Sequence, residues 1–214
     1  MDGGPNDERS TPVVYVVDDD VSVRESVDLL IRSAGWRPEV CASAREFLSR
    51  PRTLAPGCLV LDVHLPDLDG LELQQRIAID RVELPVVLIT GYGDIPMAVR
   101  AMKAGAMEVL TKPFHADVLL AAIRKGIERS RAALRELTEM RTLRERYASL
   151  SRREREVMAL VASGLLNTQV GGTLGISEIT VKAHRGRVMR KMKAGSLAEL
   201  VTMAARLRIA SPHT

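Results

Sequence analysis

Short apolar runs and helical patterns alternate along the first 123 residues. The runs are rich in β-branched residues, as is typical of strands that are buried on both faces of a sheet. Five of them occur, at Val13–Val17, near Pro38–Cys41 (a weaker one), Cys58–Leu61, Pro85–Ile89 and Glu108–Leu110. Because they are separated by other patterns and never adjoin, they predict parallel strands joined by crossover connections.

Apolar residues recur at helical spacing between these runs. The first helix is indicated by Val23, Val27 and Ile31, and Ser43 with Glu46 is a capping-box pattern that should open the second. Three further helices are predicted at Leu71–Ile79, Met97–Ala104 and from Val118 onward. Five strands alternating with five helices predict an α/β doubly wound, five-stranded parallel sheet with helices on both faces.

The pattern changes after Ile123. Residues 124–149 are dense in charge and in good helix formers, and a thin apolar stripe includes Ile127 and Leu134. We interpret this stretch as a long, solvated linker helix that continues the fifth helix. A dimer-forming coiled coil is the alternative, although the heptad pattern lapses at Arg141 and Arg144.

The remaining residues predict an all-α, four-helix unit without strands. Ser151 and Glu154 form a second capping-box pattern, and the turn Gly175-Ile176 separates two helices in the manner of a helix-turn-helix. The helices are expected after Ser151, at Asn167–Leu174, from Ser177 to about Lys193, and at Ser196–Ile209. The predicted domains are therefore residues 12–128, a helical linker at 129–149, and residues 150–211.

Composition is that of an ordinary globular protein. The chain has 214 residues, of which 46% are hydrophobic and 27% charged, and no apolar run approaches the roughly 18 residues of a membrane span. It opens with a polar stretch that does not resemble a secretory signal. Cys41 and Cys58 lie 17 residues apart in apolar surroundings, which indicates buried free thiols and a cytoplasmic protein.

Charge divides the chain into an acidic front and a basic back. Residues 1–149 carry 20 Lys and Arg against 23 Asp and Glu, whereas residues 151–214 carry 11 against 4. This asymmetry indicates two modules with different partners, and a polyanion suits the basic one.

Acidic and basic side chains follow the predicted strands at their carboxyl ends, where ligands bind in a doubly wound sheet. Clustered carboxylates repel one another unless a cation compensates, and Mg²⁺ suits them. A carboxylate beside Mg²⁺ can attack phosphorus and hold an acyl phosphate, while an ammonium group offsets the phosphoryl charge. The residues at these ends are Asp18, Asp19 and Asp20 after the first strand, Asp62, Thr90, and Lys112-Pro113.

The set Asp18, Asp19, Asp62, Thr90 and Lys112, with Lys112-Pro113, resembles the receiver domain of bacterial two-component response regulators. The resemblance covers residues 12–128. It implies that Asp62 accepts a phosphoryl group from a sensor histidine kinase, that Thr90 is the switch hydroxyl, and that Lys112 pairs with the phosphate. It also implies Mg²⁺ ligands at Asp19, Asp62 and the His64 backbone carbonyl, with Asp18 supporting the metal through water, and a cis Lys112-Pro113 peptide bond.

One residue departs from the receiver pattern. Receiver domains usually carry an aromatic residue three positions before the lysine, and Val109 stands there. The switch is therefore expected to work by packing shifts without a rotating ring. Of the nearby acids, Asp67 is interpreted as a turn residue and Asp69 as the cap of the next helix.

Two other kinds of acidic site were compared with the sequence. An EF-hand alignment with Gly70 at position 6 puts Leu65 at position 1 and Arg76 at position 12. Both positions must supply oxygen ligands, so the stretch does not form a calcium-binding loop of this type. An aspartate-based phosphatase of the haloacid dehalogenase type remains an alternative, because Asp18–Ser22 nearly matches its strand-one motif. That alternative leaves Asp62 and the basic module without a role.

The third helix of the back unit is strongly basic. It carries Lys182, Arg185, Arg187, Arg190, Lys191 and Lys193 without an acid between Ile179 and Ala198, which suits contact with phosphates and the major groove. The stretch Ser177–Arg185 resembles the recognition helix of LuxR-type domains in the NarL/FixJ subfamily. The resemblance implies a DNA interface at Thr180, Lys182, Ala183, Arg185 and Arg187, with Lys182 in the major groove.

Three glycines depart from the LuxR-type pattern. Gly171 and Gly172 each cost up to about 1 kcal/mol of helix stability relative to alanine, which predicts a soft helix before the turn. Gly186 stands where a side chain near the bases is usual. His184 is expected to pack in the core, on one face with Val181 and Val188.

These patterns together predict a cytoplasmic DNA-binding response regulator that is not an enzyme. Phosphorylation of Asp62 is expected to favour a homodimer whose two recognition helices engage paired half-sites in double-stranded promoter DNA. No membrane association is expected.

Overall fold

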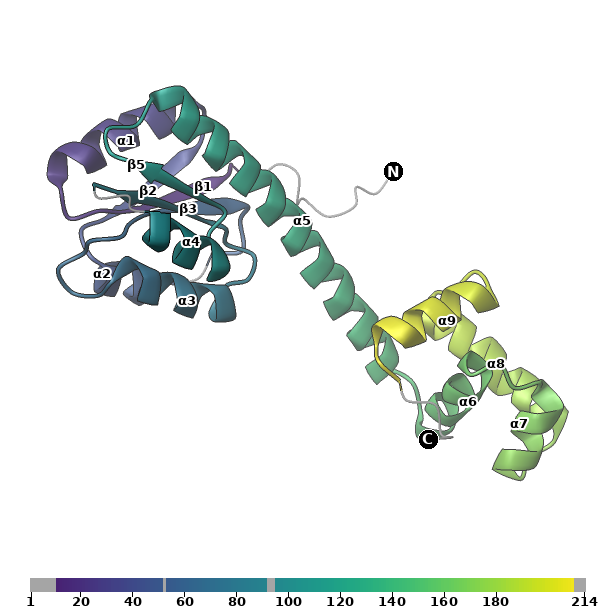
Figure 1. The fold of residues 1–214 in the computed structure, drawn as a ribbon. Helices are drawn as coiled ribbons and strands as arrows, with labels where there is room; N and C mark the ends of the chain where they lie inside the picture. Colours follow the sequence, from purple (N-terminus) through teal and green to yellow (C-terminus); the bar gives the residue numbers. More distant parts are fainter. Residues whose placement is uncertain (1–10, 52, 92–94, 210–214) are drawn as a thin grey trace. The chain divides into compact units, whose positions relative to one another are not determined.

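The computed structural model describes residues 11–51, 53–91 and 95–209, and the chain forms two compact units, Met1–Arg135 and Glu136–Thr214 (Figure 1). The first unit is built around a five-stranded parallel sheet with the order β2-β1-β3-β4-β5. Its strands are β1 (Val13–Val17), β2 (Arg37–Cys41), β3 (Gly57–Asp62), β4 (Val86–Thr90) and β5 (Glu108–Thr111). The predicted doubly wound α/β fold is confirmed.

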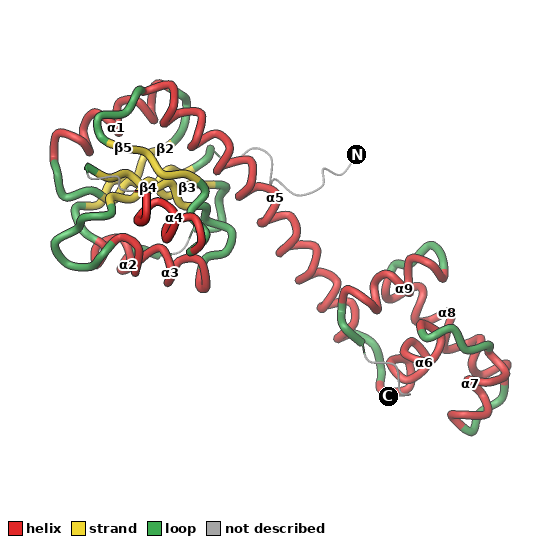
Figure 2. Tube along the Cα trace, viewed as in Figure 1, coloured by secondary structure: helices red, strands yellow, loops and turns green. Residues whose placement is uncertain are grey.

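Helices cover both faces of this sheet (Figure 2). Helices α1 (Val21–Ser33) and α5 (Ala116–Ala148) lie on one face, and α2 (Ala44–Ser49), α3 (Gly70–Asp80) and α4 (Ile95–Lys103) lie on the other (Figure 1). Alternate residues of β1 enter the two cores. Val14 and Val16 pack on the α1 and α5 side, while Tyr15 packs on the other side, where its ring meets Phe47 edge to face. The central strands are therefore apolar on both faces, as their uniform runs predict.

The second unit is all-α, as predicted. Val157, Val181 and Leu200, which are fully buried, belong to a single apolar core. Its helices are α6 (Arg152–Ala162), α7 (Asn167–Leu174), α8 (Glu178–Met192) and α9 (Leu197–Arg206), together with the last part of α5. These bounds confirm the four predicted helices, except that α9 stops three residues before Ile209, because Arg208 adopts a left-handed backbone (φ 53°).

Side-chain caps set most helix starts in the second unit. Ser151 and Glu154 form the reciprocal capping box that the sequence predicts. Ser177 accepts a hydrogen bond from the Thr180 N–H, and Gly175 ends α7 in the left-handed region (φ 65°) that glycine adopts without strain. The turn between α7 and α8 is thus fixed at both ends.

Helix α5 contributes to both units. In the first, the buried Ser130 hydroxyl accepts a hydrogen bond from the Gly57 N–H over 3.0 Å, and Leu134 is buried. In the second, Leu143 is 5% exposed and belongs to the core, with Tyr147 packed beside it. The stretch expected to be a linker therefore supplies core residues at each of its ends.

The prediction for the two cysteines is confirmed. Cys41 and Cys58 are buried free thiols, and burial raises their pKa to about 11 and about 12. Trp36 packs against the α1 and α5 side of the sheet. Within the described residues, no helix combines the length and the apolar character needed to cross a membrane.

Candidate functional site

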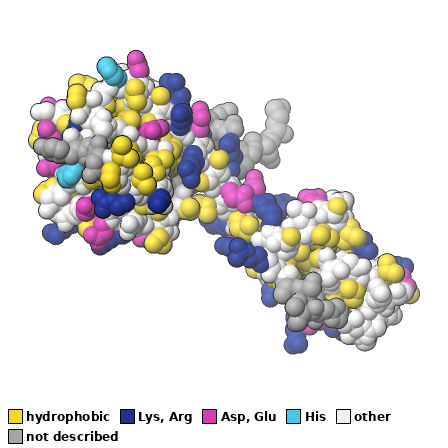
Figure 3. Space-filling model, in the orientation of Figure 1, with side chains coloured by type: hydrophobic (Ala, Val, Ile, Leu, Met, Phe, Trp, Pro, Cys, Tyr) yellow, Lys and Arg dark blue, Asp and Glu magenta, His cyan; other side chains and the backbone are white. Residues whose placement is uncertain are grey.

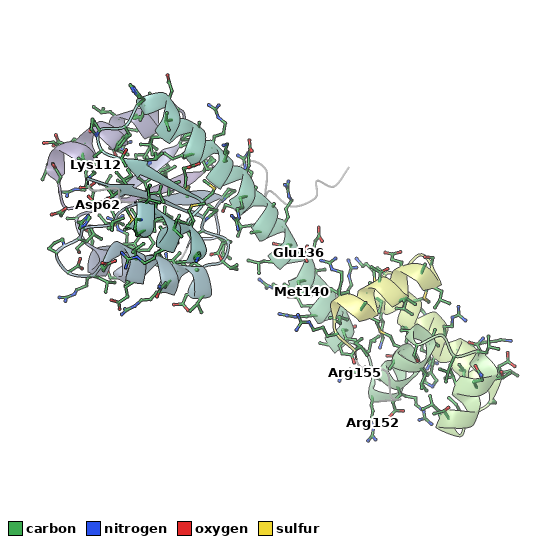
Figure 4. All side chains as sticks on the ribbon, in the orientation of Figure 1. Asp62, Lys112, Glu136, Met140, Arg152 and Arg155 are labelled. Atoms are coloured by element: carbon green, nitrogen blue, oxygen red, sulfur yellow. The ribbon has the colours of Figure 1, made fainter. Side chains whose placement is uncertain are left out.

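Three carboxylates and one ammonium group meet at the carboxyl edge of the sheet. Asp18 and Asp19 follow β1, Asp62 ends β3, and Lys112 follows β5, so the sheet order brings them together from distant parts of the chain. The Lys112 Nζ lies 2.7 Å from Asp18 Oδ2 and 2.6 Å from Asp62 Oδ2. Figure 4 labels Asp62 and Lys112 at this edge.

The β1–α1 turn holds Asp18 from several sides. The Asp20 N–H donates to Asp18 Oδ1 over 2.9 Å, and the Arg24 guanidinium donates to the Asp18 carbonyl oxygen over 2.6 Å. The Asp18 N–H itself donates to the Cys41 carbonyl. Its carboxylate is therefore buried and oriented toward Lys112. Sequence reasoning missed Arg24, because its partner is a backbone carbonyl that no side-chain motif reveals.

Asp62 is almost as constrained. Its side chain is buried, its Oδ1 accepts a hydrogen bond from the His64 N–H over 2.9 Å, and its Oδ2 faces Lys112. Helix α3 begins against this loop: a Cβ on Gly70 would collide with the Asp62 carbonyl oxygen and the Val63 Cα. Glycine at that position lets the helix approach the loop that carries Asp62.

Thr90 and the cis peptide complete the edge. Thr90 is the last residue of β4 and is fully buried, one position beyond the residue that pairs with Asp62. The Lys112 N–H donates to the Thr90 carbonyl over 2.8 Å. The Lys112-Pro113 bond is cis, as the resemblance to receiver domains implies.

Burial and pairing act against each other in the electrostatics of this edge. Burial raises the pKa of the Asp18 carboxyl, and the hydrogen bonds from Lys112 and Asp20 counter that effect only in part. Burial also lowers the pKa of Lys112, but its hydrogen bonds to Asp18 and Asp62 outweigh this and raise it. Lys112 is thus held as a cation between two acids.

The donor set fits a hard divalent cation. Asp18, Asp19 and Asp62 each offer an oxygen, and these oxygens lie within 4.8 Å of one another. Asp18 and Asp62 share one ammonium group and Asp19 adds a third carboxylate, so the three carboxylates keep an excess of negative charge over Lys112 that a cation would compensate. Oxygen ligands of this kind are those that Mg²⁺ takes in phosphoryl-transfer sites.

Three neighbouring acids lie outside the cluster and hold helix starts. Asp20 caps α1 through the Ser22 and Val23 N–H groups. Asp69 caps α3 through the Leu71 N–H, as the sequence predicts. In the Asp-x-Asp-x-Thr/Val motif of haloacid dehalogenases, Asp18 and Asp20 would be the two aspartates of the active site. The cap that Asp20 makes therefore does not favour the phosphatase alternative.

Asp67 does more than the expected turn residue. Its two carboxylate oxygens accept hydrogen bonds from the Ala44 and Arg45 N–H groups, over 3.2 and 2.8 Å, at the start of α2. These bonds lower the pKa of the Asp67 carboxyl. The capping box expected around Ser43 is incomplete. The Ser43 hydroxyl accepts the Glu46 N–H, but the Glu46 carboxylate accepts the Ala42 N–H and not the Ser43 N–H. A contact over more than twenty residues leaves no signal in a local pattern.

Val109 packs partly buried among the residues of the α2, α3 and α4 side. Helix α4 is joined to α3 there by the buried Gln74 amide, which donates to the Ala101 carbonyl over 3.0 Å. The position that usually carries an aromatic ring is thus part of the apolar contact between β5 and the helix layer.

The second unit presents a basic helix beside the α7–α8 turn. Lys182, Ala183 and Arg187 are exposed on α8, and Lys182 makes an intrahelical ion pair of 2.8 Å with Glu178. Thr180 and Arg185 are half-buried, and the Arg185 guanidinium donates to Asn167 of α7 over 3.3 Å. His184 is half-buried, so it packs less deeply than Val181 and Val188.

Charge is distributed differently over the two units. In the space-filling view, basic and acidic side chains are interspersed on the visible face of the first unit (Figure 3). Helix α8 contains six Lys and Arg between Lys182 and its C-cap Lys193, against the single acid Glu178. The distribution is that of a protein surface suited to a polyanion.

Comparisons with known families give the same division. Residues 14–124 match the model of the response regulator receiver domain, and residues 148–204 match that of bacterial regulatory proteins of the luxR family. Both matches lie within the units that the fold defines.

Relatives share this arrangement over nearly their whole length. The chain is 45% identical to nodulation protein W of Bradyrhizobium diazoefficiens, over 99% of this chain and 93% of that protein. It is 43% identical to the response regulator protein TmoT of Ectopseudomonas mendocina, over 95% and 91%. Among solved structures, the response regulator StyR is similar with a TM-score of 0.81 and 44% identity, over 92% of this chain and 100% of that one.

Proposed function

Because this chain belongs to the DNA-binding transcriptional response regulators that join a receiver domain to a LuxR-type helix-turn-helix domain, we propose that Asp62 accepts a phosphoryl group from a sensor histidine kinase and that phosphorylation promotes dimerisation and promoter binding. One observation carries the proposal. The Asp62 carboxylate is buried at a strand end with the Lys112 ammonium 2.6 Å from one of its oxygens and two further carboxylates beside it.

The chain's own residues have separate tasks in the transfer. An Asp62 oxygen attacks phosphorus, the new O–P bond forms, and the P–N bond to the kinase's histidine breaks. The His64 N–H holds Oδ1, and the Lys112 ammonium offsets negative charge on the phosphoryl oxygens. Mg²⁺, held by Asp18, Asp19, Asp62 and the His64 carbonyl, would neutralise further charge when bound.

Thr90 would report the state of Asp62. Its position at the end of β4 lets its hydroxyl approach a phosphoryl group on the neighbouring strand, and β5 with Val109 lies on its other side. The apolar packing around Val109 would then carry the change to the surface near α4. In thermodynamic terms, phosphorylation shifts the population toward the DNA-competent state.

The basic helix would contact DNA. We infer that Lys182 and Ala183 enter the major groove and that Thr180, Arg185 and Arg187 contact phosphates or hold the helix against them, with a dimer engaging two half-sites. We also propose residues 12–128 and 150–211 as receiver and DNA-binding domains, with the helix at 129–149 between them, and a cytoplasmic location.

Phosphorylation of a single residue tests the proposal. Incubation with Mg²⁺ and acetyl phosphate should add one phosphoryl group that is stable in acid and labile in base, as expected for an acyl phosphate. Asp62→Asn should abolish the adduct, measured by intact-protein mass, while Asp67→Asn should retain it. Labelling that survives Asp62→Asn would contradict the assignment.

A further inference from the structure

Helix α8 exposes one large apolar side chain among its cations. Ile179, the second residue of the helix, is 79% exposed. The residues that follow on the same side, Ala183, Gly186 and Arg190, are small or charged. Residues at the start of a recognition helix are those that reach base edges. Covering this side chain on binding would remove apolar surface from water, which is favourable.

Helix geometry puts Ile179 on the side away from the protein core. Val181, Val188 and Met192 face the core and are at most 1% exposed. With 3.6 residues per turn, the opposite side of the helix is made of four other residues. They are Ile179, Ala183, Gly186 and Arg190, and all four are exposed.

The surface around Ile179 allows close approach. Ala183 and Gly186 are small, and a Cβ added at Gly186 would meet no atom within 4 Å. Lys182 and Arg187 flank this strip on its two sides and bring positive charge toward the DNA. The strip is low and uncharged from Ile179 to Gly186, and Arg190 follows it one turn later. A helix start of this shape with cationic flanks can approach base edges in the major groove.

The start of the helix is fixed before DNA arrives. The Ser177 hydroxyl accepts the Thr180 N–H over 3.2 Å and lies 2.8 Å from the Thr180 hydroxyl. Ile179 lies between these two residues, and a β-branched side chain has few rotamers to lose on binding. The backbone that carries the Ile179 side chain is therefore fixed before binding.

We propose that Ile179 is a specificity-determining residue that packs against the C5-methyl group of a thymine in each half-site. That methyl is the apolar group that distinguishes thymine in the major groove. The proposal rests on the DNA-binding function proposed above and adds the base to be read. Arginine or lysine at this place would select guanine, whereas isoleucine offers no hydrogen bond and selects by apolar contact.

The test removes the methyl group from the DNA and the side chain from the protein. The full chain, phosphorylated with acetyl phosphate and Mg²⁺, first selects sequences from a random duplex pool. Each thymine of the selected site is then replaced in turn by deoxyuridine, which lacks only the C5-methyl. We expect one such replacement per half-site to weaken binding about fourfold, the value of one buried methyl-sized group.

The variant Ile179→Ala should bind the thymine and deoxyuridine versions of that position equally well. Ile79→Ala removes an isoleucine that is 82% exposed at the end of α3, and it should preserve every deoxyuridine effect. Lys182→Ala should lower affinity for all versions and reduce the salt dependence of binding.

The outcomes separate the two levels of the proposal. A pool that yields no enriched sequence contradicts the DNA-binding function itself. An enriched site whose deoxyuridine versions all bind like the parent overturns the role of Ile179. A methyl effect that persists unchanged in Ile179→Ala overturns it as well, because another side chain would then read the thymine.

Discussion

At the scale of single residues, Arg24 shows that the acidic cluster depends on more than its acids. Its guanidinium anchors the Asp18 carbonyl over 2.6 Å and so fixes the turn from which Asp18 and Asp19 project. Charge and geometry predict opposite effects of removing it. Loss of a cation from the helix that follows Asp18 and Asp19 would strengthen Mg²⁺ binding, whereas loss of the anchor would weaken it.

We expect the loss of the anchor to prevail. The hydrogen bond from Arg24 to the Asp18 carbonyl positions the metal ligands directly, whereas solvent screens the charge of a partly exposed guanidinium. Arg24→Ala should weaken Mg²⁺ binding about tenfold, measured by calorimetric titration. Arg32→Ala, which removes an exposed arginine paired with Asp28 on the same helix, is the control and should have little effect. Unchanged or tighter binding by Arg24→Ala would refute the anchoring role.

Two adjacent glycines in α7 differ in what they do. A Cβ on Gly171 would lie 2.7 Å from the Ile176 carbonyl oxygen, so glycine there allows the turn to pack against the helix. A Cβ on Gly172 would meet no atom within 4 Å. The predicted softness of α7 therefore belongs to Gly172, and Gly171 has a packing reason.

Alanine substitutions at these two glycines should change the stability of the fold in opposite directions. Gly172→Ala should raise the free energy of unfolding by about 0.5–1 kcal/mol, because alanine is the better helix former in open space. Gly171→Ala should lower it, since backbone must move to admit the methyl group. Urea unfolding followed by helix circular dichroism measures both, and equal shifts in the same direction would contradict this account.

At the scale of elements, a buried carboxylate ties α6 to α8. Glu154 is 4% exposed, and its Oε2 accepts the Ser151 N–H over 2.8 Å and the Lys191 ammonium over 2.7 Å. The hydrogen bond from Lys191, with that from Ser151, lowers the pKa of the Glu154 carboxyl. A lowered folded-state pKa stabilises the fold above the ordinary carboxyl pKa of about 4.3, and that contribution is lost as pH falls through the folded-state value.

Glu154→Gln should therefore cost about 2 kcal/mol of unfolding free energy at pH 7, because a charged hydrogen bond is replaced by a neutral one. The difference from wild type should shrink as the pH falls below about 4. Hydrogen exchange of α6 and α8 amides in the full chain reports this stability. Glu156→Gln, which removes the half-buried partner of Arg153 on the same helix, is the control and should cost clearly less than Glu154→Gln at pH 7.

At the scale of the whole molecule, the helical stretch after the receiver fold is divided between the two units. Leu143 lies in the core of the second unit, and Arg206 of α9 contacts Glu136 and Glu139 over 2.7 and 3.3 Å. Figure 4 labels Glu136 and Met140 on this part of α5. Residues 136–149 therefore supply packing to the DNA-binding unit as well as a connection.

A fragment of residues 136–214 should accordingly fold more stably than one of residues 150–214, as measured by thermal unfolding. In the full chain, Leu143→Ala should destabilise the second unit by about 2–4 kcal/mol, because it opens a cavity in the core. Leu137→Ala removes a 41% exposed leucine earlier on the same helix and should have a much smaller effect. Equal stability of the two fragments would show that this stretch is only a connection.

The sequence by itself determined what local patterns encode. Apolar runs, uniform in the central strands and weaker in β2, indicated the five strands. Helical spacing and caps such as Ser151 and Ser177 indicated the helices, and residues at strand ends indicated the acidic cluster. These signals are readable because hydrogen bonding within a helix and burial of a strand depend on neighbours in the chain. The residues of the site were named for the same reason, since strand ends of a parallel sheet share an edge.

The tertiary structure alone decided contacts between distant segments. Asp67 reaches α2 across more than twenty residues, Arg24 takes a backbone carbonyl, and Gly171 makes room for the turn after its helix. The division of α5 between two cores is of the same kind, because the burial of Ile127 and Leu143 depends on which helices and strands pack against them. Such contacts are set by packing in space, and a one-dimensional pattern carries no record of them.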